Sequence, residues 1–122
     1  AAVQLIKELR EHHPNAKLML NRGLPVLDRV APYLDYALAE SIRVEYNFDT
    51  GKARYFSDAI YAEETARLKQ AQAINPALKV VTLDYWNMAD AKGVRNIYAE
   101  QRSHGFIPYV TTVKLDTLHE EP

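Results

Sequence analysis

The sequence predicts an α/β protein with a parallel sheet, and two of its features carry that prediction. Helical and strand-like segments alternate four times along the 122 residues, always in the order helix and then strand. The strand-like segments are short and almost uniformly apolar, which is typical of strands covered on both faces. Strands joined by helical crossovers run parallel to one another. These connections fit both a four-stranded open sheet and half of a (β/α)8 barrel.

The first half of the chain predicts two helix–strand pairs. Residues 3–12 carry apolar side chains at helical spacing, and Pro14 ends that helix. Residues 17–23 form a short apolar run that ends in glycine, which indicates a buried strand. Residues 25–34 predict a short helix, and residues 35–41 the second strand.

Residues 42–57 interrupt this alternation and have no clean period. The stretch contains the turn signal Asp49-Thr50-Gly51. It is longer than an ordinary βα loop of roughly 2–6 residues, and long loops at strand ends often line sites. It is therefore either part of a site or an inserted surface loop that packs on itself. Its aromatic side chains are Tyr46, Phe48, Tyr55 and Phe56.

The second half predicts two more helix–strand pairs. Ser57 is placed to cap a long helix. The expected elements are a helix at 58–74, a strand at 79–86, a helix at 90–103 with Gly105 at its end, and a strand at 106–112. Residues 115–118 hint at one further turn of helix.

Composition excludes several classes of function. The chain has 15 Lys and Arg against 16 Asp and Glu, and a net charge of −1 argues against a polybasic nucleic-acid binder. No apolar run approaches the roughly 18 residues of a membrane span. Cysteine is absent and the four histidines are scattered, so no metal site is expected. Nucleotide-binding glycine motifs are also missing, and we expect no cofactor.

Functional groups in parallel α/β folds gather at the carboxyl ends of the strands. Glu40 ends the second predicted strand, on the same face as Tyr36 and Leu38. A carboxylate there costs several kcal/mol of desolvation unless it is paired or borders a solvent-filled pocket. Glu40 is thus either an acid/base or nucleophilic group in a cleft, or a structural partner of Arg22 or Arg43.

The other strand ends supply candidate binding residues. Asp84 shares a strand face with Val80 and Thr82, and it is either a site residue or a supporting, helix-capping acid. Aromatic rings suit stacking on the C–H faces of sugars, although core packing is the alternative for both aromatic candidates after Asp84. The expected substrate-binding residues are Asn21, Arg22, Asp84, Tyr85, Trp86 and Tyr109. Carboxylates with aromatics and without a cofactor fit glycoside hydrolysis, which needs two carboxyl groups across the scissile bond.

Four segments in order resemble the second half of the glycoside hydrolase family 114 barrel. They are LMLNRGL at 18–24, VAPYLDYALAES at 30–41, VVTLDYWN at 80–87 and HGFIPYVTT at 104–112. The family is typified by endo-α-1,4-polygalactosaminidase, and similar domains occur in Pel-type exopolysaccharide proteins. The resemblance runs over nearly the whole chain.

This resemblance implies that residues 1–122 are one piece, carrying strands five to eight of a (β/α)8 barrel. It implies hydrolysis of an α-1,4-linked, galactosamine-containing polysaccharide in an extracellular or periplasmic setting. Glu40 would be a catalytic carboxylate. The family's second acid, an aspartate at the end of strand four, has no match here. Asn21 and Tyr85 would be pocket residues and Asp84 a binding or supporting acid, while Trp86 stands where the family varies.

Two hypotheses follow for this sequence. In the first, the chain is half of a polygalactosaminidase-like hydrolase and is inactive alone. In the second, it is a non-catalytic module of the same ancestry that binds polysaccharide or serves in assembly. The first and last strands, residues 17–22 and 106–112, would have unpaired edges in isolation. We therefore expect the partner to be the N-terminal half of the barrel in a longer chain, or a second copy.

Overall fold

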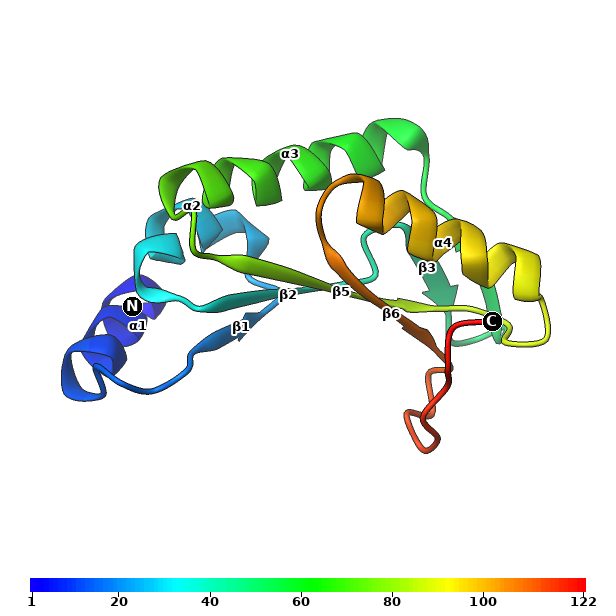
Figure 1. The fold of residues 1–122 in the computed structure, drawn as a ribbon, viewed down its shortest axis with the longest axis horizontal. Helices are drawn as coiled ribbons and strands as arrows, with labels where there is room; N and C mark the ends of the chain where they lie inside the picture. The colour runs from blue at the N-terminus through cyan, green and yellow to red at the C-terminus, as the bar shows by residue number, and fades with distance from the viewer.

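A four-stranded parallel sheet forms the centre of the protein in the computed structural model, which describes residues 1–122 (Figure 1). Its strands are β1 (Met19–Asn21), β2 (Tyr36–Glu40), β5 (Lys79–Tyr85) and β6 (Ile107–Thr111). The strands lie side by side in chain order, β1-β2-β5-β6, and every pairing is parallel. A sheet that never reverses its strand order is wound in one direction, as in a (β/α)8 barrel, whereas a doubly wound sheet has a switch point.

The helices that join these strands lie on one side of the sheet (Figure 1). They are α2 (Leu27–Val30), α3 (Asp58–Ile74) and α4 (Ala91–Ser103), whereas α1 (Ala2–His12) precedes β1 and contacts α2. The short helix expected at 25–34 is divided, because Pro25 and Pro32 each open a 3₁₀ turn, η1 (Leu24–Val26) and η2 (Ala31–Tyr33), on either side of α2. No helix combines the length and the apolar character that crossing a bilayer requires.

Side-chain caps set the starts of the two long helices. The Ser57 hydroxyl accepts a hydrogen bond from the Ile60 amide at 3.2 Å, as the sequence predicts. Asp90 caps α4 in the same way, with its Oδ1 3.0 Å from the Gly93 amide. Because each cap satisfies an otherwise unpaired amide, both helices begin at fixed positions relative to the strand that precedes them.

The interpretation of residues 42–57 as irregular was wrong. They contain an antiparallel hairpin of β3 (Val44–Asn47) and β4 (Lys52–Tyr55). The expected turn lies between these strands: Asn47 Oδ1 accepts from the amides of Asp49 and Thr50, and Gly51 has a left-handed φ of 68°. The further helical turn expected at 115–118 is also wrong, since the chain after β6 has no helix.

Small side chains on β2 face the helices. Ala37 and Ala39 are buried in the main core with Leu27 and Val30 of α2 and Leu68 of α3. Alanine leaves room for a helix to approach the strand closely, so this face is packed without gaps. A second cluster holds α4 and the hairpin against β6, through Val44, Val94, Ile97, Tyr98 and Val110.

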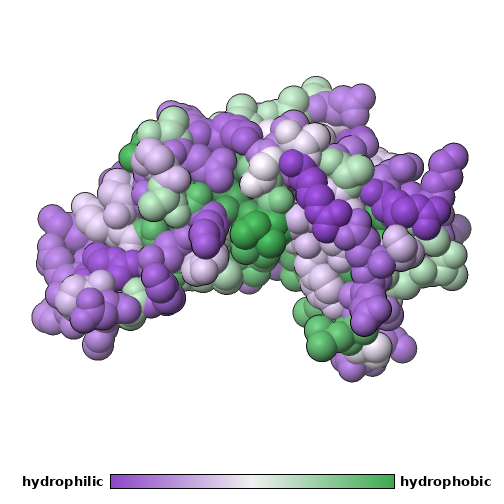
Figure 2. Space-filling model, in the orientation of Figure 1, coloured by the Kyte–Doolittle hydropathy of each residue, from purple (hydrophilic) through white to green (hydrophobic).

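The opposite face of the sheet carries no helix. Tyr36, Leu38 and Glu40 alternate onto it and are only half-buried. Met19 at one edge and Ile107 at the other expose about half of their surface, 52% and 49%. In the space-filling view the molecule is an arch, hollowed on the side away from the helices (Figure 2). In a (β/α)8 barrel the face without helices is the interior of the barrel.

Candidate active site at the carboxyl edge of the sheet

Glu40 is the last residue of β2, and two donors hold its carboxylate. The Tyr85 hydroxyl donates to Oε1 at 2.6 Å, from the end of the neighbouring strand β5. The Arg22 Nε lies 3.4 Å from Oε2, from the end of β1 on the other side. Three neighbouring strand ends therefore bring three of the predicted site residues together around one carboxylate.

Left-handed backbone conformations turn the chain away immediately after β1 and β2. Arg22 has φ 60° and Ser41 has φ 59°, a region that non-glycine residues rarely adopt. Each residue still donates its amide to the next strand, Arg22 to the Leu38 carbonyl at 2.9 Å and Ser41 to the Leu83 carbonyl at 2.8 Å. These bonds offset the strain, and such strain is common at functional sites.

Tyr85 is a stable donor to Glu40. Burial, together with the hydrogen bond to Glu40 and the charge of Glu40, raises the pKa of Tyr85 to about 12. The phenol therefore keeps its proton at any physiological pH. Because the proton stays on Tyr85, its hydroxyl remains a donor to Glu40.

Glu40 borders two cavities. One, of about 450 Å³, runs towards α3 and is also lined by Arg22 and Ile60. The other, of about 220 Å³, runs towards the hairpin and is also lined by Arg22, Tyr46 and Tyr85. A carboxylate between two solvent-filled hollows is accessible to a ligand from both sides.

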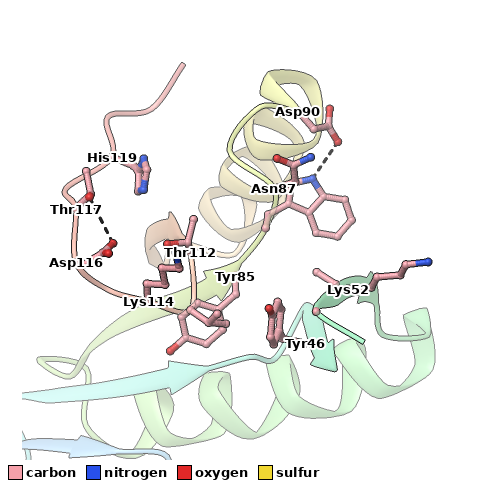
Figure 3. Close-up of a pocket in the computed structure, with 14 residues that line it drawn as sticks. Tyr46, Lys52, Tyr85, Asn87, Asp90, Thr112, Lys114, Asp116, Thr117 and His119 are labelled. Atoms are coloured by element: carbon pink, nitrogen blue, oxygen red, sulfur yellow. Dashed lines mark hydrogen bonds between the residues drawn. The ribbon is translucent and has the colours of Figure 1, made fainter. Parts of the chain in front are cut away.

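A third cavity, of about 780 Å³, continues beyond the second one (Figure 3). Tyr46 and Tyr85 line both, with their ring centroids 6.5 Å apart. The hairpin residue Lys52 and the tail residue His119 lie on opposite sides of this third cavity. The three cavities together follow the carboxyl ends of the strands and are called the groove below.

Trp86 lines the third cavity at its boundary with α4. Its Nε1 donates to Asp90 Oδ2 at 2.9 Å (Figure 3), and its ring lies 5.0 Å from that of Tyr55 on the hairpin. Gly93 lies against this arrangement so closely that an added Cβ would overlap Trp86 and Asp90. The ring orientation of Trp86 is thus fixed from three sides.

Asp84 does not face the site, and the expectation that it binds substrate is corrected by its position. It is completely buried on the opposite face of β5 from Tyr85. Its Oδ1 accepts from the amides of Arg43 and Val44 at 3.3 and 3.2 Å, and its Oδ2 from Gln101 Nε2 at 2.7 Å. Burial raises the pKa of Asp84 to about 6, against these hydrogen bonds, which lower it. Asp84 therefore holds the base of the hairpin to β5.

The remaining predicted residues have other surroundings. Asn21 is exposed beside Leu38, on the same face as Glu40, but lines none of the three cavities. Tyr109 accepts a hydrogen bond from the His119 amide at 3.1 Å and so holds the C-terminal tail. Arg43 does not pair with Glu40; its guanidinium pairs with Glu100.

Sequence reasoning missed two parts of the groove. Glu45 lines the cavity beside Glu40. The chain after β6 lines the third cavity through Thr112, Val113, Lys114, Asp116, Thr117 and His119. The alternation of Val44 and Tyr46 with Glu45 and Asn47, ahead of a turn signal, was the available sign of a strand. The tail residues have no comparable pattern. No three His, Cys, Asp or Glu side chains converge as metal ligands anywhere in residues 1–122.

A family model and two solved structures indicate the same protein family for this chain. The model of glycoside hydrolase family GH114 matches residues 1–121. The structure of the glycoside hydrolase domain of PelA from Pseudomonas aeruginosa is similar at a TM-score of 0.79 and 25% identity, over 98% of this chain and 46% of that chain. A glutamate-to-alanine variant of that domain matches at 24% identity, with the same TM-score and coverage. No curated protein matches the sequence. The chain thus spans about half the length of the structures it resembles.

Proposed function

This chain belongs to glycoside hydrolase family 114, and from that we propose that it supplies half of the active site of a polysaccharide hydrolase. The proposed substrate is an α-1,4-linked polymer that contains galactosamine. Glu40 is proposed as one of the two catalytic carboxylates. The observation that carries this role is its position: it ends a strand, is held by Tyr85 and Arg22, and borders two cavities.

Glycoside hydrolysis requires carboxyl groups in fixed positions, and the surroundings of Glu40 meet this requirement. Two carboxyl groups act across the scissile bond, one as acid or base and the other as base or nucleophile. Each must be held at a fixed distance from the substrate, because small displacements cost large factors in rate. A hydrogen bond from Tyr85 to one oxygen and an ion pair with Arg22 at the other position the Glu40 carboxylate in this way.

The second carboxylate is proposed to come from outside these residues. The chain covers 46% of the PelA domain, and its strands β1, β2, β5 and β6 are proposed as strands five to eight of a (β/α)8 barrel. The first four strands would pair with the free edge of β1 and close against β6. An aspartate at the end of the fourth strand would then face Glu40. The whole hydrolase is proposed to act in the periplasm or outside the cell.

A galactosamine polymer also suits the charge of the groove. Its free amines are protonated at neutral pH, and carboxylates attract them. Along the three cavities lie five carboxylates, Glu40, Glu45, Glu64, Asp90 and Asp116. The cations that line them are Arg22, Lys52, Arg67 and Lys114. Each of the two acids in the cavity beside Glu40 pairs with an arginine, Glu40 with Arg22 and Glu45 with Arg54, so the excess of acid is small and is spread along the groove.

The test is Glu40→Gln in the complete hydrolase domain, assayed on α-1,4-linked galactosamine oligomers. Glutamine keeps an oxygen that accepts from Tyr85 but cannot exchange a proton or attack carbon. We expect the rate to fall by about 10²–10⁴-fold, the usual contribution of such a group. The matched control is Glu120→Gln, an exposed glutamate of the tail that lines none of the three cavities; it should keep wild-type activity.

Two outcomes would reject the proposal. Full activity of Glu40→Gln would remove Glu40 from the catalytic pair. Binding of the oligomer without any turnover by the wild type would favour the second hypothesis, a non-catalytic module of the same ancestry.

A further inference from the structure

The hairpin carries an aromatic pair, exposed Phe48 and half-buried Tyr46, beside the proposed catalytic carboxylate. Phe48 leaves 79% of its surface exposed. Its ring meets that of Tyr46 edge to face, with the centroids 5.0 Å apart. Single exposed apolar residues are common on protein surfaces. Phe48 differs from such residues because it lines a cavity that Glu40 also lines.

The aromatic surface is continuous from the hairpin to Glu40. Tyr46 contacts Phe48 on one side and faces Tyr85 on the other, with centroid distances of 5.0 and 6.5 Å. Tyr85 in turn donates its hydroxyl to Glu40. A sugar ring bound on Tyr46 and Phe48 would therefore be separated from the Glu40 carboxylate by one aromatic side chain, Tyr85.

Glu45 brings a carboxylate to the same cavity. Its Oε2 is 2.5 Å from Arg54 Nε and Nη2, and its Oε1 has no protein partner. Arg54 is largely exposed, with 79% of its side chain accessible, so solvent weakens its hold on Glu45. One oxygen of Glu45 thus remains available to an additional donor.

The size of the cavity limits what it can hold. Its volume is about 220 Å³, below the roughly 300–1,000 Å³ of pockets for drug-sized ligands. One pyranose ring is a ligand of this scale, whereas a longer segment needs the neighbouring cavity of about 780 Å³. Half of the eight lining residues are aromatic, which suits the apolar C–H face of a sugar.

We propose that this cavity is a subsite for a single amino-sugar unit of the polymer. The C–H face of the ring packs on Tyr46 and Phe48, and the protonated amine is bound by Oε1 of Glu45. The hairpin then selects for unmodified galactosamine next to the cleaved bond. The identity of the polymer rests on the proposed function, but the binding of an amino sugar here does not need cleavage.

The test measures binding of a defined galactosamine oligomer to the complete domain by calorimetry. Phe48→Ala should weaken binding by about tenfold, the scale of one aromatic contact. Glu45→Gln should weaken it by about tenfold or more, the scale of a hydrogen bond to a charged group. The fully N-acetylated oligomer carries no amine charge, so Glu45→Gln should leave its affinity unchanged.

Matched controls separate the subsite from general surface effects. Leu118→Ala removes another exposed apolar side chain, one that lines none of the three cavities, and should leave binding unchanged. Phe48→Trp keeps an aromatic face and should restore the affinity that Phe48→Ala loses. Wild-type affinity in Phe48→Ala, or equal losses on both oligomers in Glu45→Gln, would overturn the proposal.

Failure of the proposed function would give a different pattern. In that case no oligomer is cleaved by the wild type, or Glu40→Gln cleaves as fast as the wild type. The comparison of Phe48 and Glu45 variants by binding still decides the subsite, because calorimetry does not require turnover.

Discussion

Tyr85 and Glu40 lie 45 residues apart in the chain, yet the hydroxyl of one donates to the carboxylate of the other at 2.6 Å. The sheet register accounts for this, because Glu40 pairs with Leu83 and Tyr85 follows two residues later on the same face. The hydrogen bond between Tyr85 and Glu40 requires that β2 and β5 lie side by side in this register. Their contact is therefore a property of the parallel pairing of β2 with β5.

Tyr85→Phe removes only the donor of this hydrogen bond. Hydrogen bonds to charged groups contribute about 1.5–3 kcal/mol, so we expect kcat/KM on galactosamine oligomers to fall by about tenfold or more. Tyr36→Phe is the control, since Tyr36 lies on the same face of β2 and its hydroxyl has no hydrogen-bond partner. Equal activity of the two variants would show that the Tyr85 hydroxyl does not support Glu40.

The buried carboxyl of Asp84 makes stability depend on acidity. Its pKa is about 6 in the folded protein against 3.8 ordinarily, so the folded state binds a proton more tightly than the unfolded state. The free energy of unfolding should then fall by roughly 3 kcal/mol as pH rises from about 4 to about 6. Urea unfolding at a series of pH values measures this slope.

Asp84→Asn should flatten that slope and preserve the fold. The asparagine oxygen still accepts from the Arg43 and Val44 amides, and Gln101 can reverse its amide to accept from the new NH₂. Asp84→Ala leaves both amides unpaired and should cost several kcal/mol. An unchanged pH slope in Asp84→Asn would assign the dependence to another group.

Gly93→Ala tests the packing around Trp86. Helix propensity alone predicts stabilisation by about 1 kcal/mol. The added Cβ overlaps Trp86 and Asp90, and overpacking costs about 1–3 kcal/mol, so we expect the opposite sign. Trp86 is the only tryptophan, and its fluorescence should change with the displaced ring. Asn96→Ala, at an exposed position of the same helix, should instead stabilise slightly.

Arg43→Lys should loosen the hairpin from the helices. The guanidinium lies between the rings of Tyr55 and Tyr61, 4.6 and 4.8 Å from their centroids, and pairs with Glu100. Lysine cannot reproduce this planar contact. We expect the free energy of unfolding, measured by thermal unfolding, to fall by a few kcal/mol. Proteolysis within residues 44–55 should become faster. Arg67→Lys, in an exposed pair with Glu63, should have almost no effect.

The sequence predicted the parts of the fold that local patterns encode. Apolar runs mark the four strands, and Ser57 marks the start of α3. The hairpin was missed because its strands are four residues long and half-exposed, and its polar residues hide the period of two. Short strands depend on tertiary packing, here on Val44 in the second core cluster.

The sequence predicted where the site lies in the fold, but it predicted only some of the residues that form it. Parallel topology places strand ends together, and so Glu40, Arg22 and Tyr85 meet. Asp84 and Tyr85 are adjacent in sequence and both carry a polar group, and the strand register decides which of them faces the groove. The alternation places Asp84 on the face of β5 with buried Val80 and Thr82. That face turned out to be the one that the helices cover.

The hairpin forms its own two-stranded sheet, and its hydrogen-bonded ladder is not shared with the strands that hold Glu40. Its base is fixed by Asp84, whereas the turn at residues 48–51 is exposed. Insertions or deletions at that turn would leave the register of β2 and β5 intact. Under the two proposals above, sugar selectivity and catalysis would lie on separate segments, so a change in the hairpin turn would alter which sugar is bound without altering the strands that hold Glu40.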